Sequence, residues 1–166
     1  TAIGDVNDGA RWLVSEGIAN ADQLAAVGWS YGGYAALQSG VHEPGLFRAI
    51  VAIAPVTDLP ALRQDSMAFA NGRNVSEYLG SGPHIVAGSP ARHADRMTAP
   101  VLLFHGDQDI NVDIGQSRRM HDRLNDAGAS TELVIYEGVD HGLRDSEVRA
   151  QMLDRSDRFL REALGL

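Results

Sequence analysis

The stretch Ala25–Leu37, AAVGWSYGGYAAL, places one serine, Ser30, between an apolar run and a run of small residues. Leu24–Trp29 predicts a short buried strand and Tyr31–Ser39 predicts a helix, so Ser30 falls at the turn between them. Glycines two residues before and after the serine complete the pattern G-x-S-x-G. Such a serine is either a nucleophile held out on a sharp turn or only the polar residue of a tight junction.

The nucleophile hypothesis accounts for the two glycines. The backbone at the apex of such a turn is strained, and strand and helix approach closely there, so residues without side chains are expected at Gly28 and Gly32. The turn ends at the N-terminus of the helix, where the backbone N–H of Tyr31 can bind a developing oxyanion. Because the chain has 18 glycines, the pattern can also arise by chance. The interpretation therefore depends on partners elsewhere in the sequence.

Candidate partners follow two later strands. A serine nucleophile needs a general base, and the base needs an acid that orients it. Pro100–Phe104 predicts a buried strand and is followed by Asp109, and Glu132–Tyr136 predicts another and is followed by His141. The order serine, acid, histidine, each after a strand, is that of α/β-hydrolases. The sequence therefore predicts that these three residues meet at one edge of a parallel sheet.

The neighbouring polar residues leave alternatives open. Asp107 competes with Asp109 as the acid, and the spacing after His105-Gly106 favours Asp109. These two aspartates, with His105 and His141, also offer oxygen and nitrogen ligands, but no recognisable metal signature accompanies them. We expect no metal and no cofactor. His105 is expected to pack or hydrogen-bond at the strand end, and Asp140 to be a solvated loop residue.

Strand and helix patterns alternate along the whole chain. A fourth apolar segment, Phe47–Ala54, predicts a strand, and amphipathic patterns predict further helices at Asp5–Glu16, Gln116–Ala127 and Ser146–Leu164. Continuously apolar strands separated by helices indicate a parallel sheet covered on both faces. We predict an α/β protein of about four parallel strands, which resembles a truncated α/β-hydrolase fold.

One stretch departs from this alternation. Residues 57–98 are rich in glycine and proline, so we expect an irregular excursion near the active site, with one or two short helices. No linker divides the chain, and we predict a single, partial catalytic domain over residues 1–166.

Four segments also carry a resemblance to a known family. They are GWSYGGYAAL at the turn, APVTDL after the second strand, SPARHADRMTAPVLLFHGDQDINV around the acid and DHG at the histidine. Over roughly Leu24–Gly142 the chain resembles the catalytic domain of the prolyl oligopeptidase family of serine peptidases, which includes dipeptidyl peptidases and acylaminoacyl peptidases. The resemblance implies Ser30 as nucleophile, Asp109 as the acid of an H-G-x-x-D-x-x-V pattern, and His141 as general base.

The resemblance also implies an activity. It points to cleavage of amide bonds in short peptides through an acyl-enzyme. The same residues would serve a carboxylesterase acting on small acyl esters, which is the alternative. An alternative of another class is a catalytically weak hydrolase fragment that acts as an oligomerising module. One departure from the family pattern, Asp113 after Val112 where members often have proline, is interpreted as a loop variation.

A larger departure concerns the sheet. In the family the strand before the serine has neighbours on both sides, and a second oxyanion donor comes from a part that this sequence does not show. Leu24–Trp29 would then be an edge strand with unpaired backbone groups beside an apolar face. We expect either a longer polypeptide or a homo-oligomer in which another copy covers this edge.

Composition excludes several other classes of function. The chain of 166 residues is 44% hydrophobic and 22% charged, with a net charge of −8, so no basic stripe suggests a nucleic-acid partner. No run of about 18 apolar residues predicts a membrane span, and no leader-like segment begins the sequence. The absence of cysteine removes disulfides, thiolate metal sites and a cysteine nucleophile. We expect a cytoplasmic protein whose partner is a short peptide or acyl ester.

Overall fold

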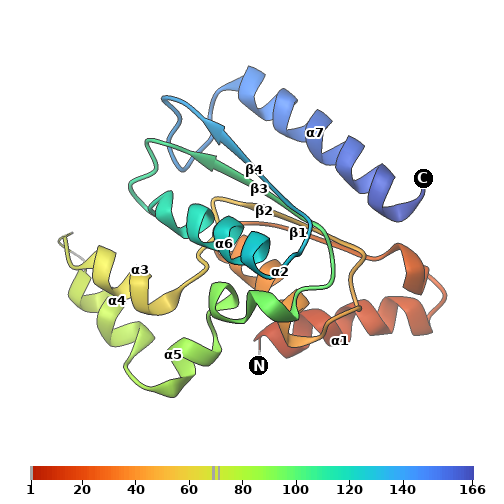
Figure 1. The fold of residues 1–166 in the computed structure, drawn as a ribbon, viewed down its shortest axis with the longest axis horizontal. Coiled ribbons are helices and arrows are strands. Elements are labelled where there is room, and N and C mark those ends of the chain that lie inside the picture. Colours follow the sequence, from red (N-terminus) through yellow and green to blue (C-terminus); the bar gives the residue numbers. More distant parts are fainter. Residues whose placement is uncertain (1, 69, 71) are drawn as a thin grey trace.

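Four parallel strands form the centre of the molecule. The computed structural model describes residues 2–68, 70 and 72–166, and its sheet has the order β1-β2-β3-β4 with helices on both faces (Figure 1). The strands are β1 (Ala25–Trp29), β2 (Ala49–Ile53), β3 (Val101–Gly106) and β4 (Thr131–Tyr136). The predicted fold class is confirmed, with strand bounds within two residues of the prediction. Thr1, at which the predicted domain begins, lies outside the described residues, and the single-domain organisation stays a prediction.

Helices cover the two faces unequally. One face carries α2 (Tyr31–His42) and α6 (Gly115–Asp126), with α1 (Ala2–Ser15) behind α2, and α7 (Ser146–Leu164) crosses the other face (Figure 1). A short 3-10 helix, η1 (Ala21–Gln23), leads into β1. The sequence-based helices at these places are confirmed.

The excursion of residues 57–98 is more regular than expected. Its described residues form α3 (Leu59–Ser66), α4 (Gly72–Leu79), α5 (Pro83–Ala87) and the 3-10 segment η2 (Pro90–Arg96). Phe69 and Asn71, which belong to this stretch, lie outside the described residues. The prediction of one or two short helices was too low because its prolines lie in the first turns of three of these helices. Proline is tolerated there, since the first N–H groups of a helix have no partner within it.

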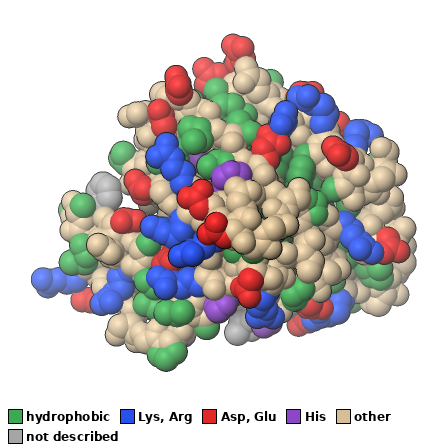
Figure 2. Space-filling model, in the orientation of Figure 1, with side chains coloured by type: hydrophobic (Ala, Val, Ile, Leu, Met, Phe, Trp, Pro, Cys, Tyr) green, Lys and Arg blue, Asp and Glu red, His purple; other side chains and the backbone are tan. Residues whose placement is uncertain are grey.

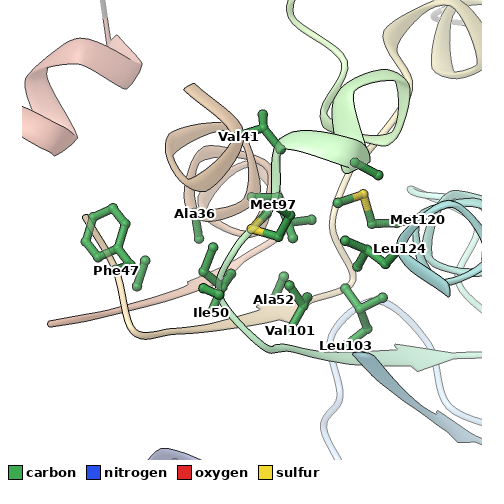
Figure 3. Close-up of a cluster of buried hydrophobic side chains, with 14 of the residues drawn as sticks. Ala36, Val41, Phe47, Ile50, Ala52, Met97, Val101, Leu103, Met120 and Leu124 are labelled. Carbon is green, nitrogen blue, oxygen red and sulfur yellow. The ribbon is translucent and has the colours of Figure 1, made fainter. Parts of the chain in front are cut away.

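Apolar side chains fill both sides of the sheet. Figure 3 shows the larger cluster, in which Ile50 and Leu103 meet α2 and Met120 and Leu124 of α6. Close approach of α2 depends on a glycine, because a Cβ on Gly40 would lie 2.4 Å from Ile50 Cδ1. On the opposite face, Val51, Leu102 and Phe104 are buried beneath Met152, Phe159 and Leu160 of α7.

The edge strand β1 leaves apolar side chains exposed. Register with Val51 and Ile53 places Val27 and Trp29 on the α7 face, yet these side chains are 58% and 43% exposed. Ser30 N–H donates to Ile53 O, so by the period-two alternation of strands the backbone groups of Val27 and Trp29 point away from β2. In the described part of the chain, β1 therefore has one neighbouring strand and an open, apolar outer edge.

Charges are mixed over the visible surface. Figure 2 shows basic and acidic side chains interleaved on the face that carries α6 rather than gathered into a stripe of one sign. Among the described residues, no helix combines the length and apolarity needed to cross a membrane. The expected cytoplasmic location stays a prediction.

Candidate active site

The turn between β1 and α2 holds Ser30 in an unusual conformation. Its φ of 57° and ψ of −117° lie in a region that a residue with a side chain rarely adopts. Two backbone bonds fix this geometry: Ser30 N–H donates to Ile53 O at 2.8 Å, and Tyr34 N–H donates to Ser30 O at 3.0 Å. Strain of this kind persists only where the surroundings impose it. The side chain of Ser30 is thereby presented at the carboxyl end of β1 and the N-terminus of α2.

The two glycines that flank this turn are not equivalent. A Cβ on Gly28 would lie 2.1 Å from Gly32 O, a distance that requires the strand or the helix to move. A Cβ on Gly32 would meet no atom of the described residues within 4 Å. The close-approach explanation thus holds for Gly28 and is wrong for Gly32, whose Cα faces open space in this chain. The next residue, Gly33, is more crowded than Gly32, since its Cβ would lie 3.0 Å from Pro55 Cβ.

The structure brings the three predicted residues together. His141 Nδ1–H donates to Asp109 Oδ2 at 2.6 Å, and Ser30 Oγ–H donates to His141 Nε2 at 3.0 Å. A carboxylate only accepts, so the proton of the neutral imidazole lies on Nδ1 and Nε2 is free to accept from the serine. The Asp109 side chain is fully buried and that of His141 is 18% exposed. Trp29 lies beside the imidazole, with ring centroids 6.1 Å apart.

Asp109 is held as a carboxylate by several donors. Its Oδ1 accepts the backbone N–H groups of Asn111 and Val112, both at 2.9 Å. Burial by itself would raise the pKa of Asp109, but hydrogen bonds from His105, from Val112 N–H and from His141 outweigh it and lower the pKa to about 2. The carboxylate is therefore ionised at every pH where the histidine could act as a base.

The loops that carry Asp109 and His141 are joined to each other. Gln108 N–H donates to Val139 O at 3.0 Å, and Gly138 N–H donates to Asp107 Oδ1 at 2.7 Å. Gly106 allows this approach, because a Cβ there would lie 2.2 Å from Val139 O. Asp107 thus caps the neighbouring loop, and of the two candidate acids it is Asp109 that contacts His141.

The loop after His141 is anchored to α7. Arg149 donates from Nε to Leu143 O at 2.5 Å and from Nη2 to Gly142 O at 3.1 Å. Leu143 is buried and has a φ of 43°, so this loop is also strained. Asp140 accepts from Gly142 N–H at 2.9 Å, which is a loop-stabilising contact. No local sequence pattern connects Arg149 with His141, so its contact with this loop was not predicted.

An apolar cavity of about 530 Å³ opens beside Ser30. Tyr31, Tyr34 and Val56 line its part near the serine. The excursion supplies the remaining wall through Leu59 and Leu62 of α3 and Asn74, Val75, Tyr78 and Leu79 of α4. Tyr78 is 91% exposed, so it stands at the rim and does not pack into a core. Residues of the excursion and Ser30 thus line the same cavity.

A metal centre needs several ligand side chains close together. Across residues 2–68, 70 and 72–166, no group of three or more His, Asp or Glu side chains is placed to hold a metal ion. Both ring nitrogens of His105 are engaged in hydrogen bonds, with Ser117 Oγ at 2.7 Å and Val112 O at 2.9 Å, so neither is available to a metal ion.

A sequence model of the prolyl oligopeptidase family matches residues 1–166. The match covers the full length of the chain. The chain belongs to the prolyl oligopeptidase family. Among curated relatives, it is 27% identical over 172 residues to dipeptidyl peptidase family member 6 of Caenorhabditis elegans, covering 97% of this chain and 23% of the relative. It is 26% identical over 170 residues to dipeptidyl aminopeptidase BIII of Pseudoxanthomonas mexicana, covering 97% and 24%. The chain therefore spans about a quarter of the length of these family members.

Solved structures of prolyl oligopeptidase relatives share its fold. A puromycin-hydrolyzing peptidase of Mycobacterium tuberculosis superposes with a TM-score of 0.90 at 29% identity, over 99% of this chain and 25% of that one. An acylaminoacyl peptidase of Pyrococcus horikoshii superposes with a TM-score of 0.73 at 26% identity, over 91% and 25%. The resemblance inferred from the four sequence segments is confirmed.

Proposed function

We propose that this chain carries the nucleophile, acid and base of a serine hydrolase that cleaves short peptides through an acyl-enzyme. The observation that carries the proposal is the continuous hydrogen-bonded path from Ser30 Oγ through His141 to Asp109. Membership of a peptidase family supports an amide substrate over other acyl compounds.

The geometry suits a division of roles among these residues. Ser30 Oγ attacks the carbonyl carbon while His141 Nε2 takes its proton, and the imidazolium then gives that proton to the leaving amine. Asp109 keeps the imidazole in the Nδ1–H form before attack and stabilises the imidazolium afterwards. A water molecule repeats the sequence on the acyl-enzyme, which releases the acid and restores Ser30.

The negative charge that develops on the carbonyl oxygen needs donors. Tyr31 is the first residue of α2, so its N–H has no acceptor within the helix and is available to the oxyanion. The positive end of the helix dipole favours the same charge. We propose Tyr31 N–H as one oxyanion donor. Losing one of two donors costs about 10²–10³ in rate. The rate at which this chain alone cleaves a substrate therefore depends on whether a second donor is present.

The cavity beside Ser30 bears on the substrate. Its walls are aromatic and aliphatic apart from Ser30 and Asn74, which suits an acyl group with an apolar side chain. Similar walls would accept a small apolar acyl ester. The alternative activity is therefore a carboxylesterase, and it is favoured where the oxyanion site is incomplete, since an activated ester needs less stabilisation than an amide.

A fluorophosphonate probe tests the proposal. It labels only a serine whose hydroxyl is activated, so we expect labelling of the wild-type chain that is absent in Ser30→Ala. Ser15→Ala, at an exposed serine of α1, is the matched control and should be labelled like the wild type. An unlabelled, folded wild-type chain would contradict the proposal and would favour the catalytically weak, oligomerising module. Comparing an aminoacyl anilide with a short-chain nitrophenyl ester separates peptidase from esterase.

We further propose that a second copy of the chain covers the outer edge of β1. Val27 is the middle residue of this strand, and its backbone groups face the open edge. Antiparallel pairing about Val27 would place Ala25 of each copy opposite Trp29 of the other. The segment Ala25–Trp29 carries no charge, so nothing repels at the two-fold axis, which is the commonest symmetry of oligomers.

Light scattering with size exclusion tests this arrangement. We expect a dimer that Val27→Lys converts to a monomer, since the pairing would place the two lysines directly opposite each other. Ile135→Lys on β4, the other edge strand, is the control and should leave the dimer intact. A wild-type chain that stays monomeric at tens of micromolar would refute the second copy as the occupant of this edge.

A further inference from the structure

The carboxylate of Asp109 has a second imidazole beside it. His105 Nε2 lies 3.3 Å from Asp109 Oδ2, the same oxygen that accepts from His141 Nδ1. The His105 side chain is fully buried and lies on β3, four residues before the acid. It is thus a fixed part of the wall against which the acid rests.

The hydrogen bonds of His105 define where its proton lies. Nε2 faces Val112 O at 2.9 Å, and a carbonyl only accepts, so Nε2 carries the hydrogen. Nδ1 then accepts from Ser117 Oγ–H at 2.7 Å. The Nε2–H is shared between Val112 O and Asp109 Oδ2, a three-centre arrangement. Ser117 is a fully buried residue of α6, so the ring is anchored to that helix.

The same contacts close the turn that presents the acid. Val112 donates its N–H to Asp109 Oδ1 at 2.9 Å and offers its carbonyl to His105. Val112, the last residue of the turn from 109 to 112, is therefore held by Asp109 through its N–H and by His105 through its carbonyl. Without this donor, the buried Val112 carbonyl loses its partner and Asp109 Oδ2 keeps only the bond from His141.

We propose that His105 is a positioning residue for the acid of the triad, acting through Asp109 on the orientation of His141, with Ser117 holding its ring in place. This inference rests on the proposed function, since it assigns Asp109 the role of the acid. His105 touches neither the reacting atoms nor the cavity beside Ser30. Its expected influence is on the rate of attack by Ser30 and not on substrate binding.

Three variants separate donor from volume. His105→Leu fills a similar volume but removes the donor, and it should slow fluorophosphonate labelling by about 10- to 100-fold, the range expected when a buried partner is left unsatisfied. With a nitrophenyl ester, kcat should fall while KM stays within about twofold. His105→Gln carries a side-chain N–H near the position of Nε2 and should restore most of the rate. Ser117→Ala should reduce labelling by less than His105→Leu, about threefold to tenfold.

A spectroscopic readout tests the same inference without turnover. The Nδ1 proton of His141 bonded to Asp109 should give a downfield proton NMR resonance, assigned by its loss in His141→Gln. We expect this resonance in the wild type and His105→Gln, and a broadened or shifted one in His105→Leu. If the wild type shows the resonance but no labelling, the hydrolase proposal fails while the positioning role is still tested by NMR.

Two results would overturn the positioning role. One is a folded His105→Leu with the resonance and labelling rate of the wild type. The other is a His105→Gln as slow as His105→Leu at equal melting temperature, because the donor would then not matter. Should His105→Leu fail to fold, Ser117→Ala decides: an unchanged resonance and rate would count against the proposal, and a change in both would support it.

Discussion

Ser30 lies between two regions of different construction. On one side, which we call the closed side, the loops 106–112 and 137–143 hold Asp109 and His141 through hydrogen bonds to each other, to β3, to α6 and to α7. On the other side, which we call the open side, β1 has no outer neighbour among the described residues, and the Cα of Gly32 faces empty space. The contacts within this chain therefore suffice to bring Ser30, His141 and Asp109 together, whereas the second oxyanion donor that our proposal needs would come from whatever covers β1.

The largest effect should come from the centre of the closed side. Asp109→Asn replaces an acceptor with an amide that favours the wrong tautomer of His141, and we expect labelling of Ser30 to fall by about 10⁴-fold with little change in fold. Asp107→Asn is the matched control, because an amide oxygen can still accept from Gly138 N–H. Rates within about threefold of each other for these two variants would contradict the choice of Asp109 as acid.

The two glycines of the turn compare the sides directly. Gly28→Ala forces a Cβ into Gly32 O, and we expect a loss of about 3 kcal/mol in unfolding free energy together with lost labelling. Gly32→Ala meets nothing and adds a better helix former, so stability should stay equal or rise by up to about 1 kcal/mol. Denaturant unfolding measures both. Equal destabilisation by the two substitutions would show that the open side is filled.

Acid titration probes the charge on the closed side. The pKa of Asp109 is lowered from 3.8 to about 2, so its contribution to stability is fully present above pH 4 and is lost as the pH falls through 2. That contribution is about 2 kcal/mol. Denaturant unfolding at pH 6 and pH 2 should show a larger loss for the wild type than for Asp109→Asn. An identical loss in both proteins would mean that other groups dominate the acid sensitivity.

The smallest effect should come from the periphery of the closed side. Arg149→Ala removes two hydrogen bonds to the loop after His141, and we expect labelling to slow by about tenfold, with about 1 kcal/mol lost in stability. Arg149→Lys keeps the charge but not the fork that reaches both carbonyls, so it should recover only part of the rate. Arg158→Ala, an exposed arginine paired with Asp154, is the control. If it matched Arg149→Ala, the loop anchor would have no specific role.

Much of this arrangement could be predicted because it depends on local patterns. Apolar runs indicated the four strands, and parallel strands bring their carboxyl ends to one edge of the sheet. The sequence alone therefore predicted that Ser30, Asp109 and His141 lie close together. The number of helices in the excursion was underestimated. Proline breaks a helix when it lies in the interior but is favourable in the first turn, and the sequence does not show which position each proline takes.

Other features depend on distant parts of the chain and left no local signal. The spacing after His105-Gly106 already favoured Asp109 over Asp107, but nothing near Asp107 indicated its hydrogen bond from Gly138 in another loop. The crowding at Gly28 and its absence at Gly32 depend on which elements lie beside the turn. Arg149 lies on α7 and donates to the loop 137–143. The amphipathic pattern of this helix predicts which face is buried but not which partners its polar side chains bind.

Gly106 has a consequence for how this site can be altered. Because Gly106 has no side chain, Val139 O of the loop 137–143 lies against the loop 106–112. Gln108 and Asp107 add their hydrogen bonds at the same place. The two loops can therefore be replaced only together, although many residues separate them along the chain. A chimera that takes residues 106–112 from a relative would need residues 137–143 from the same donor, because each loop is shaped to the other's backbone.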